Sequence, residues 1–331
     1  MPNSPEVSVL LPVFNCERYI GEAIKSILDQ TFQAFELLVI DDESTDRTGE
    51  LVQTVADDRI KYLKVPHGGL VPALNFGLAA SSGSFIARMD ADDRALPERL
   101  DVQLRYLKKH TFVDIVSSDV HIINAAGVRT GTQKQRNVTN ESLRAALLYQ
   151  KRAKPIIHPS VMMRREVLDH LKGYREFTFA EDHDLWLRAI DRFEIRRINQ
   201  FLLEYRIHEG GVSRTRVVEQ CTASAMSAVC YLIEKHSGQD IFRDYRPEFD
   251  DLSSMLSQHL RQRYVPQTEA FRDTKSALRG GNPLAGFFAF TRLFARYGFT
   301  AMPGNTTKTV GKLVASLASH YLDGMIKRDA D

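Results

Sequence analysis

The feature that most constrains the fold of this chain is a regular alternation of short apolar segments and amphipathic segments in its first hundred residues. Four segments have the length and composition of β-strands, namely residues 7–13, 37–40, 60–65 and 85–89. Between them, apolar residues recur at helical spacing in residues 19–28, 51–55 and 70–80. Apolar strands that alternate with amphipathic helices are typical of a parallel sheet covered by helices on both faces. The sequence therefore predicts an α/β fold.

This alternation continues to about residue 212 and then stops. Further strands are expected at residues 113–124, 156–163 and 194–205, and further helices near residues 140–149, 165–171 and 182–192. From residue 214 onward the pattern is helical, without strands. A chain of 331 residues is long enough for two domains. We therefore expect an α/β domain over residues 1–212 and a helical C-terminal region over residues 213–331.

The C-terminal region contains the most basic part of the chain. Residues 261–331 carry 11 Lys and Arg against 5 Asp and Glu, whereas the net charge of the whole chain is +2. Apolar residues in the segment 310–326 follow helical spacing closely. We expect this apolar stripe to pack on the α/β domain or on a partner, such as a second copy of the chain. A solvated basic surface and a contact with anionic lipid are the two interpretations of the charge.

The composition excludes several classes of protein. The three cysteines, Cys16, Cys221 and Cys230, are odd in number and lack C-x-x-C spacing, which argues against a disulfide framework and a zinc site. The first residues lack a signal-peptide pattern, and no apolar run is long enough to span a bilayer. Dinucleotide-binding, P-loop and nucleophile-elbow motifs are absent from the sequence. We expect a cytoplasmic protein without a nucleic-acid partner, peripheral at the inner face of the membrane if its C-terminal helices bind lipid.

Acidic residues follow directly after the strand expected at residues 85–89, in the run Asp90-Ala91-Asp92-Asp93. In open α/β sheets, ligands bind beyond the carboxyl ends of the strands. Two carboxylates two residues apart can hold Mg²⁺ or Mn²⁺, and such a cation stabilises a departing diphosphate. An acidic turn that caps the helix beginning near Pro97 is an equally good interpretation of these residues alone. Within the run we expect Asp92 to be the metal ligand, Asp90 its helper and Asp93 a helix cap.

Polar residues also follow the first two expected strands. Asp42 is placed to accept the N3–H of a uracil or thymine ring, and Phe14 is placed to lie against such a ring. Taken alone, both are explained more simply as parts of strand ends and helix caps.

Three residues further along the chain are candidates for catalysis. Asp182 opens a helical segment, where a carboxylate is stabilised by the helix dipole and can also act as a general base toward an acceptor hydroxyl. Arg206 and His208 follow the last expected strand, where they could supply a phosphate clamp and a metal ligand. A lone histidine is more often structural, and the same alternative applies to His158.

The order and spacing of the motifs are more informative than each motif alone. Over roughly residues 5–212 they comprise Pro12-Val13-Phe14-Asn15, Ser26-Ile27-Leu28-Asp29-Gln30-Thr31, Glu36-Leu37-Leu38-Val39-Ile40-Asp41-Asp42-Glu43-Ser44-Thr45-Asp46, Ala73-Leu74-Asn75-Phe76-Gly77, Asp90-Ala91-Asp92-Asp93 and Glu181-Asp182-His183-Asp184-Leu185-Trp186-Leu187-Arg188. This series closely resembles glycosyltransferase family 2, a family of inverting enzymes with the GT-A fold. The resemblance implies a mostly parallel, Rossmann-like sheet flanked by helices, with the C-terminal helices as an extension.

The resemblance also implies roles for single residues. Those expected to contact the nucleotide are Pro12, Val13, Phe14, Asn15, Asp42, Asp90 and Ala91. Those expected to hold the metal are Asp92, Asp90 and His208. Arg88 is expected to line the donor sugar, Arg206 to contact the diphosphate, and Asp182 to be the general base. Glu43 departs from the family, which usually has Gly or Asn there, so the turn after Asp42 is expected to bend less freely.

Together these observations predict an inverting glycosyltransferase that uses Mn²⁺ or Mg²⁺. The donor is expected to be a nucleoside-diphosphate sugar linked to UDP or dTDP, and the acceptor a glycan or lipid-linked molecule of cell-surface polysaccharide synthesis. A sugar nucleotidyltransferase and a non-catalytic scaffold that binds nucleotide sugars are the alternatives. A nucleotidyltransferase would be expected to carry a Gly-, Arg- or Lys-rich loop after its first strand, and Phe14-Asn15-Cys16-Glu17 is not such a loop.

Overall fold

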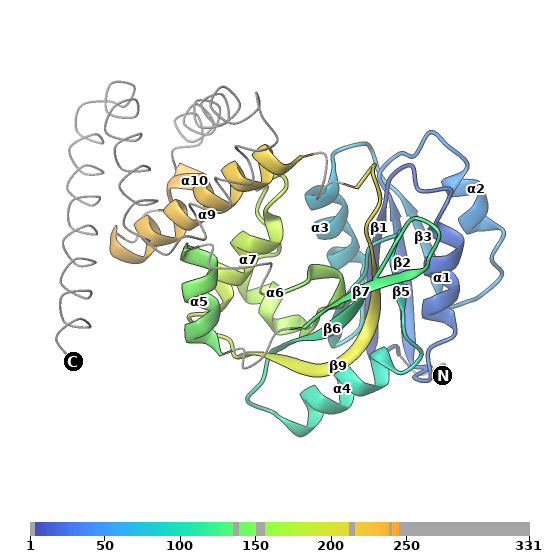
Figure 1. Ribbon diagram of the computed structural model, residues 1–331, viewed down its shortest axis with the longest axis horizontal. Coiled ribbons are helices and arrows are strands. Elements are labelled where there is room, and N and C mark those ends of the chain that lie inside the picture. The colour runs from blue at the N-terminus through green and yellow to red at the C-terminus, as the bar shows by residue number, and fades with distance from the viewer. Residues whose placement is uncertain (1–3, 135–138, 150–155, 212–215, 238–239, 245–331) are drawn as a thin grey trace. The chain divides into compact units, whose positions relative to one another are not determined.

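The computed structural model describes residues 4–134, 139–149, 156–211, 216–237 and 240–244. These residues contain a nine-stranded mixed sheet in the order β3-β2-β1-β4-β8-β6-β9-β5, to which β7 is added through β6 (Figure 1). The strands are β1 Val7–Val13, β2 Phe35–Asp41, β3 Ile60–Lys64, β4 Phe85–Arg88, β5 Arg94–Ala95, β6 Ile115–Ile123, β7 Arg129–Gln133, β8 Met162–Arg164 and β9 Ile195–Arg206.

Helices connect the strands of the sheet, and the last two described helices follow β9. In the described residues they are α1 Ile20–Leu28, α2 Thr48–Gln53, α3 Leu70–Ala80, α4 Arg99–Lys109, α5 Asn140–Tyr149, the 3₁₀ helix η1 His158–Ser160, α6 Arg165–Leu171, α7 Glu181–Ala189, α9 Val217–Ser237 and α10 Ile241–Asp244. Figure 1 shows α1 and α2 on one side of the first strands and α3 on the other.

Both faces of β1, β2 and β4 are buried, as the continuous apolar strands predict. Strands β1, β2, β3 and β4 run parallel to one another, and β4 is antiparallel to β8, its neighbour on the other side. On one face of β1, Val9 and Leu11 belong to the same apolar core as Ile24 of α1. On the other face, α3 approaches so closely that its Gly77 lies directly against Ile40 and Leu10. The predicted α/β fold, a mostly parallel sheet flanked by helices, is therefore confirmed.

The second half of the sheet differs from the sequence prediction in detail. Residues 156–163 were expected to form a strand, but only Met162–Arg164 pair with β4 and β6, and η1 precedes them. The proline at position 159 explains the difference, because it lacks a backbone N–H for a strand ladder. Strands β5 and β7 were not predicted, since the first has two residues and the second is polar and almost fully exposed.

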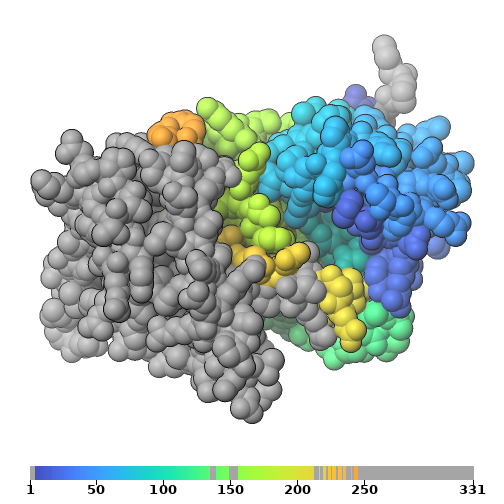
Figure 2. Space-filling model, turned by 90° about the horizontal axis from the view of Figure 1, so that it is seen from above, coloured from blue at the N-terminus to red at the C-terminus, as the bar shows by residue number. Residues whose placement is uncertain are grey.

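Helix α3 is tied to the loop between α6 and α7. The side-chain amide of Asn75 donates to the carbonyl of Tyr174 at 2.9 Å, and its oxygen accepts from the Tyr174 N–H at 2.9 Å. Figure 2 shows the corresponding surfaces side by side, with the segment from α6 to α7 in yellow-green and α3 in cyan. This pairing explains the asparagine in the Ala73-Leu74-Asn75-Phe76-Gly77 motif.

The described residues divide into two compact units. Almost all of residues 4–220 belong to the first unit, and residues 221–244 belong to the second. The predicted boundary at 212/213 falls on residues 212–215, which lie outside the described residues, as do the basic segment 261–331 and its apolar stripe. Among the helices of the described residues, none has the length and hydrophobicity needed to cross a membrane.

Candidate active site

The loops that follow β1, β2 and β4 meet at one edge of the sheet. The side-chain oxygen of Asn15 accepts a hydrogen bond from the Thr45 N–H at 2.8 Å, which joins the first two loops. The Cys16 thiol donates to the Ala91 carbonyl at 3.5 Å, which joins the first loop to the third. Asn15 has a φ of 48°, in the left-handed region that asparagine tolerates better than most residues. The polar residues predicted from three separate motifs therefore lie in one place.

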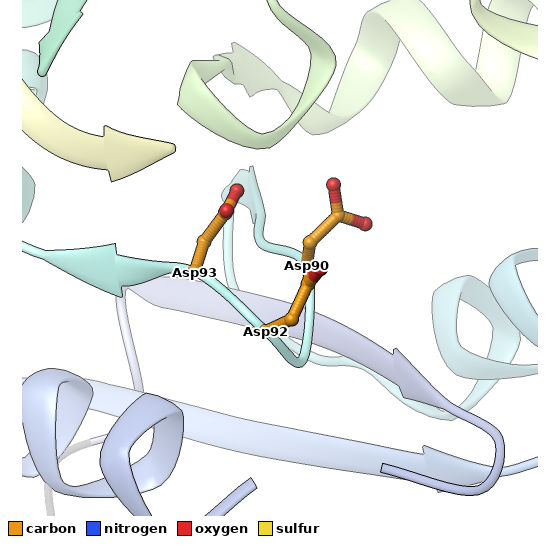
Figure 3. Close-up of side chains that lie close together, drawn as sticks. All are labelled: Asp90, Asp92 and Asp93. Carbon is orange, nitrogen blue, oxygen red and sulfur yellow. The ribbon is translucent and has the colours of Figure 1, made fainter. Parts of the chain in front are cut away.

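The acidic turn, residues 90–93, is the centre of this edge. One carboxylate oxygen each from Asp90, Asp92 and Asp93 lies within 4.8 Å of the other two. Figure 3 shows the carboxylates of Asp90 and Asp93 pointing to the same side of the turn. Asp90 pairs with the guanidinium of Arg88, and Asp92 Oδ2 lies 3.1 Å from His208 Nε2.

Asp93 does not cap a helix, contrary to the sequence prediction. Helix α4 begins at Arg99, its N-cap residue Glu98 makes no side-chain cap, and Gln30 Oε1 accepts from the Leu100 N–H of the first turn at 2.9 Å. Asp93 is instead 1% exposed and accepts a hydrogen bond from the Arg206 backbone N–H at 2.7 Å. The capping prediction was wrong because five residues separate Asp93 from the first residue of the helix. A carboxylate that caps a helix bonds to its first turn.

The carboxylates of the acidic turn are buried close together, and both effects disfavour the charged forms of Asp92 and Asp93. Burial, and then the charge of Asp90, raises the pKa of Asp92. Burial, and then the charges of Asp92 and Asp90, raises the pKa of Asp93 well above its usual range. The second oxygen of Asp93 is buried and accepts no hydrogen bond from the described residues. Three carboxylates with an unpaired buried oxygen fit a hard divalent cation such as Mg²⁺ or Mn²⁺.

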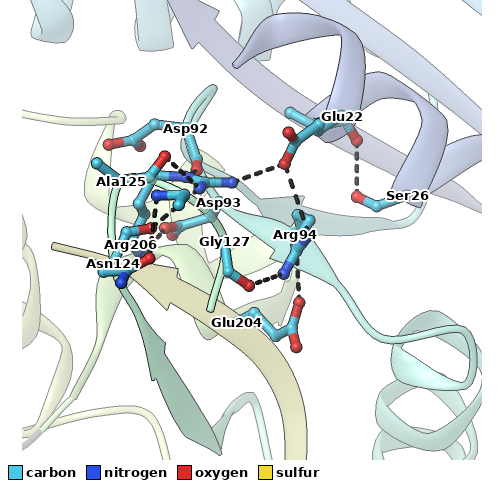
Figure 4. Close-up of polar contacts among 12 residues, drawn as sticks. Glu22, Ser26, Asp92, Asp93, Arg94, Asn124, Ala125, Gly127, Glu204 and Arg206 are labelled. Carbon is cyan, nitrogen blue, oxygen red and sulfur yellow. Dashed lines mark hydrogen bonds and ion pairs between the residues drawn. The ribbon is translucent and has the colours of Figure 1, made fainter. Parts of the chain in front are cut away.

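Arg88 and Arg206, the two predicted ligand-contacting arginines, are both buried. Arg88 is 3% exposed, and besides its pairing with Asp90 its carbonyl accepts from Arg99 Nη2 at 2.6 Å. The side chain of Arg206 is 1% exposed, and its guanidinium donates to protein acceptors that include Glu22 (Figure 4). This placement favours a supporting role for Arg206 over direct contact with a diphosphate.

The predicted nucleotide-contacting residues occupy the β1 end and the loop after it. Pro12 and Val13 are the last residues of β1, opposite Ile40 and Asp41 of β2. Phe14 follows and is 46% exposed. Its ring stacks on the ring of His67, with centroids 4.5 Å apart.

Asp42 is almost fully buried and bonds to the loop between β3 and α3. Its carboxylate accepts hydrogen bonds from the N–H groups of Gly68 at 2.8 Å and Gly69 at 3.0 Å. His67 Nδ1 lies 2.9 Å from its second oxygen. Asp42 therefore organises the loop that presents the His67 ring to Phe14. The sequence reasoning missed His67, and the Gly68-Gly69 pair before an expected helix was the available signal.

Glu43 adopts the conformation that its position requires despite being neither Gly nor Asn. Its φ is 62°, in the left-handed region, and its carboxylate accepts from the His67 N–H at 3.2 Å. The predicted restriction of this turn therefore takes the form of backbone strain, which costs an ordinary residue roughly 1–2 kcal/mol.

Asp182, the predicted general base, lies in the first turn of α7 and is half-buried. Burial raises the pKa of the Tyr174 hydroxyl; the charge of Arg88 lowers this pKa, and the charges of Glu181 and Asp182 raise it. Arg88 in turn pairs with Asp90 of the acidic turn. His158 is structural, since it is buried and its Nε2 lies 3.0 Å from the Tyr174 hydroxyl.

Two solved structures share this fold. One is S. aureus TarS 1-349 in complex with UDP-GlcNAc, which has a TM-score of 0.56 and 23% identity over 77% of this chain and 72% of that chain. The other is mannosyltransferase PcManGT from Pyrobaculum calidifontis in complex with GDP-Man and Mn²⁺, which has a TM-score of 0.51 and 21% identity over 98% of this chain and 88% of that chain. The fold is thus that of the GT-A glycosyltransferases.

Sequence comparisons narrow this class to one family. The sequence profile of Glycosyl transferase family 2 matches residues 8–172. The Bacillus subtilis protein EpsE is 36% identical over 198 residues, which cover 58% of this chain and 69% of EpsE. The Escherichia coli O-antigen biosynthesis glycosyltransferase WbnJ is 31% identical over 217 residues, which cover 63% of this chain and 82% of WbnJ. The chain belongs to glycosyltransferase family 2.

Proposed function

We propose that this glycosyltransferase moves a sugar from a nucleoside-diphosphate sugar to a hydroxyl acceptor, with inversion, at the acidic turn. The observation that carries the proposal is the clustering of three carboxylates at the end of β4, within 4.8 Å of one another. This edge also carries the loops after β1 and β2, so one ligand can contact all three loops.

We infer that Asp92, Asp90 and His208 hold Mn²⁺ or Mg²⁺. When bound, the cation neutralises the charge that develops on the leaving diphosphate. Arg88 pairs with Asp90 and His208 lies against Asp92, so each carboxylate has its own support from the chain. The Mn²⁺ in the PcManGT complex supports a divalent cation in an enzyme of this fold.

The nucleotide is proposed to lie against the exposed ring of Phe14. Asp42, which holds the His67–Gly69 loop through hydrogen bonds, is the candidate for contact with a pyrimidine base. A carboxylate has about four acceptor sites, and Gly68, Gly69 and His67 occupy most of those of Asp42. The Gly69 N–H also reaches Oδ1 of Asp42 at 3.2 Å, so a base contact would take the place of this longer bond. The UDP-GlcNAc complex of TarS supports a uridine donor, whereas the PcManGT complex contains GDP-Man.

Asp182 is proposed to take the proton of the acceptor hydroxyl as that hydroxyl attacks the anomeric carbon. A carboxylate on the face opposite the leaving group gives inversion by single displacement. Its place at the start of α7 is fixed by the neighbouring Asp184, a buried carboxylate that pairs with Arg175 and Arg188 at 2.7 Å each.

The acceptor is proposed to be a glycan or lipid-linked molecule of polysaccharide synthesis. The name of WbnJ, a glycosyltransferase of O-antigen biosynthesis, supports this class of acceptor. Family membership favours sugar transfer over the nucleotidyl transfer and the scaffold that the sequence left open.

The test is product analysis with UDP-, dTDP- and GDP-sugars in the presence of Mn²⁺. The proposal predicts release of a nucleoside diphosphate, and release of pyrophosphate would contradict it. Asp182→Asn should keep donor affinity and lose transfer by about 10²–10⁴-fold. Asp101→Asn, the same change in the first turn of α4, is the control and should transfer normally. Near-normal turnover of Asp182→Asn would remove Asp182 as the base.

A further inference from the structure

Arg206 is the point at which four segments of the α/β unit are joined. Its backbone N–H donates to Asp93, and its Nε donates to the Asp92 carbonyl at 2.6 Å. Its Nη1 donates to the carbonyls of Asn124 at 3.2 Å and Ala125 at 3.4 Å, in the turn after β6. Four of the five guanidinium N–H groups thus have acceptors within the protein once the bond to helix α1 is included.

The bond to helix α1 goes to Glu22. Arg206 Nη2 donates to Glu22 Oε2 at 2.8 Å, and the guanidinium carbon lies 4.5 Å from the centroid of the ring of Tyr19, the N-cap residue of the same helix. Glu22 is also 3.6 Å from Arg94 Nη1, and Arg94 in turn lies 2.7 Å from Glu204 of β9 (Figure 4). Its side chain is 50% exposed, whereas that of Arg206 is 1% exposed.

Glu22 and the main-chain carbonyls contribute differently to holding the Arg206 guanidinium. A buried guanidinium needs a counter-ion, and Glu22 is the carboxylate that contacts it directly. The other acceptors of the Arg206 guanidinium are main-chain carbonyls, which fix its position but do not neutralise it. Without the Glu22 charge, the guanidinium would be attracted toward the carboxylates of the acidic turn, and the bond to the Asp92 carbonyl would be weakened.

We propose that Glu22 is a positioning residue of the acidic turn, which acts through Arg206. Its carboxylate fixes the guanidinium, the guanidinium holds the Asp92 main chain, and the Asp92 side chain is thereby placed to bind a divalent cation together with His208. The inference rests on the proposed metal site. It explains why Arg206, though near the acidic turn, is turned away from solvent.

The test is calorimetric titration of Mn²⁺ alone into the full chain. Loss of a group that supports a metal ligand typically weakens metal affinity by 10–100-fold. We expect about a 10-fold loss for Glu22→Gln and a larger loss for Arg206→Lys, because lysine cannot reproduce the planar set of donors. Asp29→Asn removes an exposed ion pair with Lys25 on the same helix and should leave Mn²⁺ affinity unchanged.

The double variant separates action through Arg206 from a general effect of charge. If Glu22 acts through Arg206, Glu22→Gln combined with Arg206→Lys binds Mn²⁺ no more weakly than Arg206→Lys alone. Nucleotide affinity measured in EDTA should be the same in all variants, because neither residue touches the proposed base site. A merely structural role would instead reduce nucleotide affinity along with metal affinity.

The outcomes distinguish failure of the Glu22 proposal from failure of the proposed metal site. Unchanged Mn²⁺ affinity in Glu22→Gln, or losses that multiply in the double variant, would overturn the role of Glu22 and leave the metal site intact. A wild-type chain that binds neither Mn²⁺ nor Mg²⁺ at the acidic turn would overturn both the metal site and this inference.

Discussion

A substitution of Glu36 in β2 tests how the strands that carry the active site are held together. Glu36 is 3% exposed, and its Oε1 accepts hydrogen bonds from Ser8 Oγ at 2.6 Å and from the Ser82 N–H at 2.6 Å. Its second oxygen pairs with Lys61 Nζ at 2.6 Å. One carboxylate therefore links β2 to β1, to β3 and to the loop before β4.

The ionised form of Glu36 contributes substantially to stability. Burial alone would raise its pKa, but the pairing with Lys61 and the hydrogen bonds outweigh burial and lower the pKa from 4.5 to about 2. A difference of one between the unfolded-state and folded-state pKa corresponds to about 1.4 kcal/mol, so the ionised carboxylate of Glu36 contributes up to roughly 3 kcal/mol to the free energy of unfolding. Because the folded-state pKa is depressed, this stability is fully present above pH 4.5 and is lost as the pH falls toward 2.

Urea unfolding of Glu36→Gln at several pH values measures this contribution. At pH 7 the variant should lose up to roughly 3 kcal/mol of unfolding free energy, and its difference from the wild type should narrow as the pH falls below 4.5. Glu50→Gln, which removes an exposed ion pair with Arg47, should change stability by less than about 0.5 kcal/mol. A difference of the same size at pH 7 and pH 3 would refute the reasoning.

Three further substitutions test separate parts of the structure. Phe14→Leu removes an exposed ring from the proposed base site and should weaken nucleotide binding by about 1 kcal/mol without lowering the melting temperature; an unchanged calorimetric affinity would argue against stacking there. Gly69→Ala should destabilise by about 1–3 kcal/mol in urea unfolding, because its backbone, with φ 90° and ψ −176°, lies in a region that glycine alone adopts readily; since no atom crowds its Cβ position, the loss measures backbone strain, and an unchanged midpoint would contradict this. Asp184→Asn should cost about 3–5 kcal/mol, since it leaves the charges of Arg175 and Arg188 without their buried partner, and a loss below 1 kcal/mol would show that the pairing is replaceable.

The parallel half of the sheet and the location of the acidic turn could be predicted from the sequence because both follow from local pattern. Strands β1, β2 and β4 are mostly apolar and β3 alternates; they have four to seven residues and are separated by helices with clear apolar spacing. The carboxyl ends of parallel strands meet at one edge of a sheet, so the polar residues after them had to lie together. The placement of Asp90 and Asp92 needed no information beyond this rule.

The contacts of Asp93, Arg206 and Glu22 could not be predicted, because they join distant parts of the chain. Glu22 and Arg206 are 184 residues apart in the sequence, and Asp93 is 113 residues from Arg206. The motif pattern predicts that Arg206 contacts the diphosphate. Its burial and its protein acceptors support the positioning role that we propose for it instead. The strand expected at 156–163 was wrong for a local reason, the proline at position 159.

The most direct test of the proposed site is calorimetric titration of UDP and GDP into the full chain, with Mn²⁺ and with EDTA. We expect Mn²⁺ to strengthen the binding of at least one of these nucleotides. Asp92→Asn should abolish the gain while preserving the metal-free affinity, because the variant loses the charge that holds the cation but keeps the contacts to the base. Nucleotide affinity that is indifferent to both Mn²⁺ and Asp92→Asn would contradict the claim that the acidic turn binds the diphosphate through a metal.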